Sequence, residues 1–92
     1  MSRVRADEAA SRYVLEDDGE LLGLIEYEAD GDVVDLVHTE VDPRRRERGL
    51  GSELVAGALD DLRAKGRRVR PTCPFVARFV DEHPEYSDLV ER

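Results

Sequence analysis

Apolar and polar positions divide the chain into a first part with strand-like patterns and a second part with helical ones. The stretch "SRYVLEDDGELLGLIEYEADGDVVDLVHTEV" predicts three strands, over residues 13–16, 21–28 and 33–41. Asp17-Asp18-Gly19 and Asp30-Gly31 separate them as hairpin turns, because glycine accepts the positive φ that tight hairpins require. The second strand is apolar on both sides, so we expect a helix to cover at least one face of the sheet.

The second part of the chain alternates helix, strand and helix. Apolar residues recur at helical spacing from Leu50 to Leu62, and Gly66 follows as the expected C-terminal cap. The segment "RRVRPTC" predicts a short strand. Pro74 then opens a second helix, which Pro84 ends, because proline suits the first turn of a helix and disfavours helical backbone in the residue before it.

The chain is short enough to form one small domain. Residues 1–10 are polar and aperiodic, and we expect them to form a mobile end or a short lead-in. At this length only about 60–65 % of the surface of the unfolded chain can be buried, so spare elements are not expected. The pattern therefore predicts a single α+β domain over residues 1–92. Its mixed β-sheet has about four strands, an antiparallel three-strand meander plus one strand, with two helices.

Composition and charge exclude several classes of function. The chain has 22 acidic and 14 basic residues, and its formal net charge is -8. Binding of nucleic acid requires a basic surface that neutralises phosphates, so we expect no nucleic-acid partner. No apolar run reaches the length of a bilayer span, and "MSRVRADEAASR" lacks an apolar stretch, so no membrane segment is expected. The single cysteine cannot form an internal disulfide, which suits the cytoplasm.

The segment "DPRRRERGLGSELV" places four arginines directly before two glycines and a predicted helix. The first N–H groups of a helix have no partners within it and favour anions. Gly49 and Gly51 remove Cβ atoms from the path of such an anion, and Ser52 adds a hydroxyl. The guanidinium groups of Arg46 and Arg48 have the forked geometry that phosphate oxygens accept. The segment therefore predicts a diphosphate site, although neither the P-loop nor the dinucleotide glycine pattern is present.

This segment resembles the signature of the GNAT superfamily of acyl-coenzyme A transferases. The signature Arg/Gln-x-x-Gly-x-Gly/Ala appears as Arg46-Glu47-Arg48-Gly49-Leu50-Gly51. The segments "HTEV", "PTCPF" and "HPEY" are similar to those of the smallest GNAT-like acetyltransferases, and the resemblance covers the chain from Tyr13 onward. It implies a truncated GNAT-like fold. Ordinary members place two helices between their first and second strands and add C-terminal strands, whereas Asp17 to Glu20 joins two predicted strands directly.

The resemblance also implies a co-substrate and a reaction. The strand end formed by Thr39, Glu40 and Val41 would bind the pantetheine arm of acetyl-CoA. The diphosphate of coenzyme A would be bound by Arg46, Glu47, Arg48, Gly49, Leu50, Gly51 and Ser52. The implied activity is N-acetyl transfer from acetyl-CoA to an amine of a small molecule or a protein. A non-catalytic module that binds coenzyme A is the alternative, because much of the acceptor half of ordinary members is absent.

Two residues are candidates for the chemistry. His38 precedes the strand end and would act as a base toward an incoming ammonium group. Its alternative role is that of a buried histidine bonded to a backbone carbonyl. Cys73 stands immediately before a predicted helix, where the helix dipole lowers the pKa of a thiol, so it is a candidate nucleophile or proton donor. Its alternative role is that of a small core residue. With His83, these residues lack any zinc-site spacing, so no metal is expected.

Overall fold

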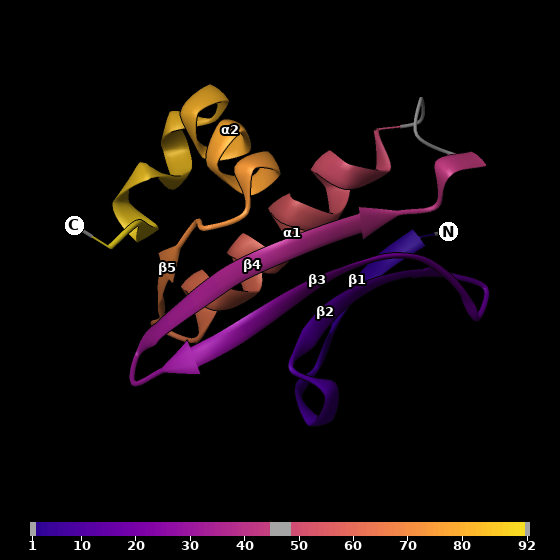
Figure 1. The fold of residues 1–92 in the computed structure, drawn as a ribbon, viewed down its shortest axis with the longest axis horizontal. Helices are drawn as coiled ribbons and strands as arrows, with labels where there is room; N and C mark the ends of the chain where they lie inside the picture. The colour runs from indigo at the N-terminus through magenta and orange to yellow at the C-terminus, as the bar shows by residue number, and fades with distance from the viewer. Residues whose placement is uncertain (1, 45–48, 92) are drawn as a thin grey trace.

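A computed structural model of the chain describes residues 2–44 and 49–91 (Figure 1). The elements in chain order are β1 (Ser2–Asp7), the 3-10 helix η1 (Glu8–Ala10), β2 (Arg12–Asp17), β3 (Glu20–Asp30), β4 (Val33–Val41), α1 (Leu50–Ala64), β5 (Arg68–Arg70), α2 (Pro74–Glu82) and the 3-10 helix η3 (Pro84–Leu89). The strands form one sheet in the order β1-β2-β3-β4-β5. Its pairs are antiparallel except for β4 and β5, which are parallel. The predicted meander, the short strand and both helices are confirmed.

The strand β1 corrects the expectation of about four strands, because the described part of the chain forms a five-stranded sheet. Residues 2–7, expected as part of a mobile end or a short lead-in, pair with β2 along its whole length. Val4 and Ala6 pack against the core, whereas Arg3 and Arg5 alternate with them. Two small apolar residues among charged neighbours form only a short alternation of apolar and polar positions. This alternation is too weak to predict a strand from the sequence alone.

The position of β1 also changes which connection joins the first two strands of the sheet. The Asp17 to Glu20 turn, expected to join the first two strands, joins β2 to β3. The connection between the first two strands of the sheet is instead η1, a 3-10 helix of three residues. The chain therefore joins its first and second strands by one tight turn of helix at Glu8–Ala10.

The helix α1 covers one face of the sheet and contacts all five strands (Figure 1). Its buried residues recur at helical spacing and are Leu50, Leu54, Val55, Ala58, Leu59 and Leu62. Its C-terminus is closed by two hydrogen bonds, from the N–H of Arg67 to the carbonyl of Leu62 and from the N–H of Gly66 to the carbonyl of Arg63. This pair of bonds is the Schellman motif, which confirms Gly66 as the cap.

The contact between α1 and β1 depends on Gly57. A Cβ atom at this position would lie 2.4 Å from Cγ2 of Val4 and 2.7 Å from its Cβ. Carbon atoms that are not bonded do not approach so closely, so the edge strand reaches the helix only because position 57 carries no side chain.

The helix α2 and η3 complete the core beside α1. Pro74 occupies the first turn of α2, and His83 ends the helix by a contact of 2.8 Å between Nδ1 and the carbonyl oxygen of Phe79. The Tyr86 hydroxyl donates to Asp60 of α1 at 2.8 Å, which ties η3 to that helix. Among the described residues, no helix has both the length and the hydropathy required to cross a bilayer.

Candidate functional site

A β-bulge in β4 sets the side of the strand on which each later side chain lies. Glu26 and Tyr27 of β3 are consecutive, yet they pair with His38 and Leu36, so Val37 is an extra residue in β4. Before the bulge, the even-numbered positions of β4 face the core, as the complete burial of Leu36 illustrates. After the bulge the phase reverses, so that odd-numbered positions face α1.

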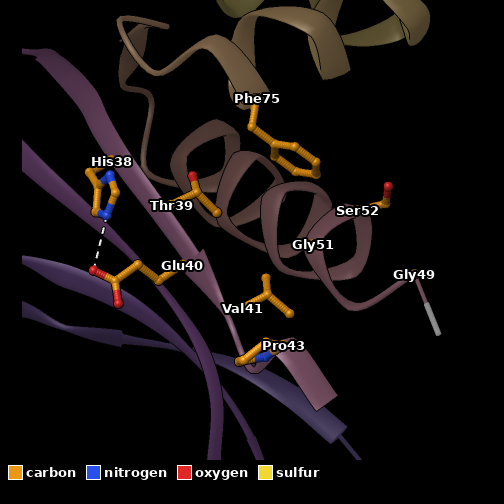
Figure 2. A pocket seen from close by; sticks show the side chains of 9 residues that line it. All are labelled: His38, Thr39, Glu40, Val41, Pro43, Gly49, Gly51, Ser52 and Phe75. Carbon is orange, nitrogen blue, oxygen red and sulfur yellow. Dashed lines mark hydrogen bonds and ion pairs between the residues drawn. The ribbon is translucent and has the colours of Figure 1, made fainter. Parts of the chain in front are cut away.

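The four residues after the bulge therefore point to two sides of β4. Figure 2 shows Thr39 and Val41 on the side that faces α1, and His38 and Glu40 on the other side. Val41 packs against the core, and the hydroxyl of Thr39 lies 3.4 Å from the Cys73 sulfur. His38 and Glu40 are exposed, with 2.9 Å between Nε2 and Oε2.

Past the bulge, β4 has an open edge: within residues 2–44 and 49–91, no strand pairs there with the side of β4 that faces away from β3. The pairing with β5 ends at Asp35. Beyond it the N–H of Cys73 donates to the carbonyl of Leu36 at 2.8 Å, and the backbone N–H of Thr39 hydrogen-bonds to the Cys73 thiol. On the opposite side the N–H of Asp42 donates to Leu22 of β3, so the carbonyl of Val41, in the same peptide plane, points toward the open edge. The backbone of Thr39 shares that direction, because alternate residues of a strand face the same neighbour.

The start of α1 provides a set of backbone hydrogen-bond donors. Gly49 precedes the helix with φ of 70°, which glycine adopts without strain, and among the described residues no side chain caps the first turn. The first intrahelical bond is donated by the N–H of Glu53 to the carbonyl of Gly49. The N–H groups of Leu50, Gly51 and Ser52 therefore have no acceptor within the helix, and the positive end of its dipole lies there.

A cleft of about 720 Å³ joins the open edge of β4 to the start of α1. It is lined by His38, Thr39, Glu40, Val41, Pro43, Gly49, Gly51, Ser52 and Phe75 (Figure 2). Residues 38–41 all line it because the cleft lies along the edge of the strand and not over one face. Leu50, a predicted site residue, is buried at 7 % exposure and is not among the residues that line the cleft.

Cys73 lies behind the lining of the cleft. Its side chain is 5 % exposed and belongs to the core, while the Thr39 hydroxyl in contact with it lines the cleft. Burial alone would raise the pKa of the Cys73 thiol. Hydrogen bonding by Thr39 and by the backbone N–H groups of Val76 and Phe75 outweighs burial, and the net pKa lies below the ordinary thiol value. The first N–H groups of α2 therefore contribute to the lowered pKa, after the Thr39 hydroxyl.

The structure does not bring His38 and Cys73 to one side of β4. His38 is 54 % exposed at its side chain and is oriented by Glu40, so it is not the buried histidine of the alternative interpretation. Cys73 contacts β4 from the side of Thr39. Any joint action of the two residues therefore takes place across the open strand edge.

Part of the predicted arginine segment lies outside the described residues. Arg46, Glu47 and Arg48 fall in the range 45–48, and the predictions made for them remain sequence predictions. Arg44 is described, and its guanidinium donates to the Asp42 carboxylate at 3.1 and 3.2 Å.

Sequence reasoning missed Phe75 and Pro43 as lining residues. The segment "PTCPF" contained the only available signal for Phe75, namely an aromatic residue in the first turn of a helix. Among the described residues, no group of three or more histidine, cysteine, aspartate and glutamate side chains is arranged to hold a metal ion.

The sequence profile of the GCN5-related N-acetyl-transferase family matches residues 12–89. The chain belongs to this family. One relative of known sequence is Protein NATD1 from Bos taurus, which is 40 % identical to this chain over 52 residues. Those residues are 56 % of this chain and 46 % of that protein, so the match spans about half the length of the relative.

Solved structures show that the GCN5-related fold extends over nearly the whole chain. A GCN5-like protein from Staphylococcus aureus superposes with a TM-score of 0.73 at 19 % identity, over 97 % of this chain and 87 % of that one. N-acetylglutamate synthase from Neisseria gonorrhoeae, solved with coenzyme A and N-acetyl-glutamate, gives a TM-score of 0.60 at 20 % identity. That match covers 91 % of this chain and 24 % of the synthase. At such identities the likeness establishes the fold of this GCN5-related chain.

Proposed function

We propose that the chain transfers an acetyl group from acetyl-CoA to an amine of a small molecule or a protein. One observation carries the proposal: a single cleft joins an open strand edge to an uncapped helix start. A coenzyme A thioester contains a diphosphate joined to a chain with amide groups. The diphosphate binds to free N–H groups at a helix start, and the amide groups bond to an open strand edge. Membership of the GCN5-related family supports the same reaction.

The donor is bound mainly by backbone groups. The amides of its arm bond to the open edge of β4 at Thr39 and Val41, and its diphosphate lies against the first N–H groups of α1. Ser52 adds a hydroxyl at the edge of the cleft. The sequence motif adds Arg46, Glu47 and Arg48, and Glu40 belongs to the same strand end.

Two side chains have roles in moving protons. The nitrogen of the acceptor forms a bond to the acetyl carbon, and the bond from that carbon to sulfur breaks. His38, oriented by Glu40, takes the proton that an ammonium acceptor must lose before it attacks. Cys73 supplies a proton to the departing thiolate, or carries the acetyl group itself as an acetyl-cysteine.

A charge placed at the start of α1 tests the donor site. Ser52→Asp is expected to raise the free energy of unfolding by about 0.3–1 kcal/mol, because a carboxylate interacts favourably with the positive end of the helix dipole. The same carboxylate is expected to weaken coenzyme A binding by about tenfold or more, since it repels the diphosphate. Thermal melting and calorimetric titration measure the two effects. The control is Ser52→Asn, because asparagine has the shape of aspartate without its charge.

The opposite signs of the two Ser52→Asp effects make the test specific. A variant that becomes more stable and still binds coenzyme A as the parent does would place the diphosphate elsewhere. A parent that binds coenzyme A but releases no thiol from acetyl-CoA with any amine would support the alternative of a non-catalytic binding module.

The base role of His38 has its own test. His38→Ala is expected to slow transfer to a protonated amine by about a hundredfold, because a positioned base contributes at least that much. Transfer to an acceptor that is already unprotonated at the assay pH should fall much less. Glu40→Gln, which keeps the imidazole, is the matched control. Equal losses with both acceptors would contradict a role in proton removal.

A further inference from the structure

We infer that Phe75 is a binding residue for the arm of the acyl donor, and that Gly51 lacks a side chain to make room for the Phe75 ring. The inference rests on the proposed function, because it assigns one part of the proposed donor to one wall of the cleft. It changes the role given to Gly51, whose missing Cβ was predicted to admit an anion.

The Phe75 ring is not part of the core. It is 42 % exposed, whereas the buried residues of α2 are Val76, Phe79 and Val80. It is one of two large apolar side chains among the described residues that remain exposed, the other being Leu21. An exposed aromatic ring in the wall of a cleft is a surface that an apolar ligand covers with a gain in free energy.

The tip of the ring rests on the first turn of α1. A Cβ atom at Gly51 would lie 2.7 Å from Cζ of Phe75 and 3.1 Å from Cε2. The ring therefore bridges from α2 to α1 and uses the space that any other residue at position 51 would fill. Figure 2 shows the ring reaching from α2 toward α1, with Val41 and Pro43 on the strand side of the cleft.

These contacts favour the arm and not the diphosphate as the ligand of the ring. The side chains of Phe75, Val41 and Pro43 are apolar, and all three line the same cleft as the open edge of β4. A chain of methylenes and amides satisfies both surfaces, since its amides bond to the strand edge while its carbon atoms cover the ring. A diphosphate gains nothing from an apolar ring.

Calorimetric titration with two ligands tests the assignment. Coenzyme A carries the arm, whereas ADP carries a nucleoside diphosphate without it. Phe75→Ala is expected to weaken coenzyme A binding by about tenfold and to leave ADP binding unchanged. Leu21→Ala removes a similarly exposed apolar side chain outside the cleft, and it should leave the affinity for both ligands unchanged.

A second pair of variants separates the two roles of Gly51. Gly51→Ala is expected to weaken coenzyme A binding by pushing the ring out of place. Added to Phe75→Ala, the same substitution should have no further effect, because no ring remains to be displaced. Melting temperatures of the single and double variants report whether the fold is retained.

Each other result overturns a specific claim. A Phe75→Ala protein that binds coenzyme A like the parent overturns the inference and leaves the proposed function intact. A Gly51→Ala effect that persists without the ring, and affects ADP equally, shows that the glycine admits the anion. A parent that binds neither ligand overturns the proposed function, and the inference with it.

Discussion

Replacing Cys73 with serine is expected to slow acetyl transfer by about a hundredfold, as the loss of a positioned proton donor or nucleophile does. The thiol is held by Thr39 at 3.4 Å, and its pKa lies below the ordinary thiol value. A serine hydroxyl in the same place does not ionise near neutral pH. Thiol release from acetyl-CoA in the presence of an amine measures the rate.

The pH dependence of the thiol has a definite sign. Because the pKa of Cys73 is lowered, the reactive thiolate persists to lower pH than in an ordinary cysteine. Thr39→Val removes the hydrogen bond from the hydroxyl, so the midpoint of alkylation by iodoacetamide should move to higher pH. Coenzyme A should slow the reaction, since it would cover Thr39, which separates the sulfur from the cleft.

Two outcomes decide the role of the cysteine. An added acetyl mass on Cys73 after incubation with acetyl-CoA supports the covalent route, whereas direct transfer leaves none. A Cys73→Ala protein that turns over at the parental rate would make the residue part of the core and nothing more.

Gly57→Ala is expected to lower the free energy of unfolding, because overpacking usually costs about 1–3 kcal/mol and outweighs the helix preference. The added Cβ would lie 2.4 Å from Val4, so β1 or α1 must move. This loss opposes the intrinsic preference of a helix, where alanine is favoured over glycine by about 1 kcal/mol. Thermal and urea unfolding measure the change.

In a protein that already carries Val4→Gly, the Gly57→Ala substitution should raise the free energy of unfolding instead of lowering it. Without the valine side chain the three atoms nearest to the new methyl group are absent, and the helix preference for alanine remains as a gain. If Gly57→Ala stabilises the parent itself, β1 does not lie against α1.

The sequence patterns that predicted the fold correctly were those with strong periods. Hairpin glycines and alternating residues identified β2, β3 and β4, and the spacing from Leu50 to Leu62 identified α1. The strand β1 was not predicted, because only Val4 and Ala6 show the alternation of apolar positions that marks a strand. Its burial depends on Gly57, which lies 53 positions away and gives no local signal.

The candidate site could also be predicted only in part, because some of its features have a local sequence pattern and others do not. The glycine segment and the strand end were recognisable as short motifs, and the cleft brings both together. The bulge at Val37 was not recognisable, because "VVDLVHTEV" contains no glycine or proline that marks an extra residue. As a result the sequence did not show that His38 and Cys73 lie on different sides of β4. Phe75 was missed because exposure depends on Gly51, a residue of another helix.

The bulge at Val37 also divides β4 into two parts that evolution can alter separately. The part before it supplies Val34 and Leu36 to the core, where most substitutions would unfold the domain. The part after it presents His38 and Glu40 to solvent, where substitutions have little effect on stability. Substitutions at these two positions can therefore change the surface beside the cleft while the domain retains its fold.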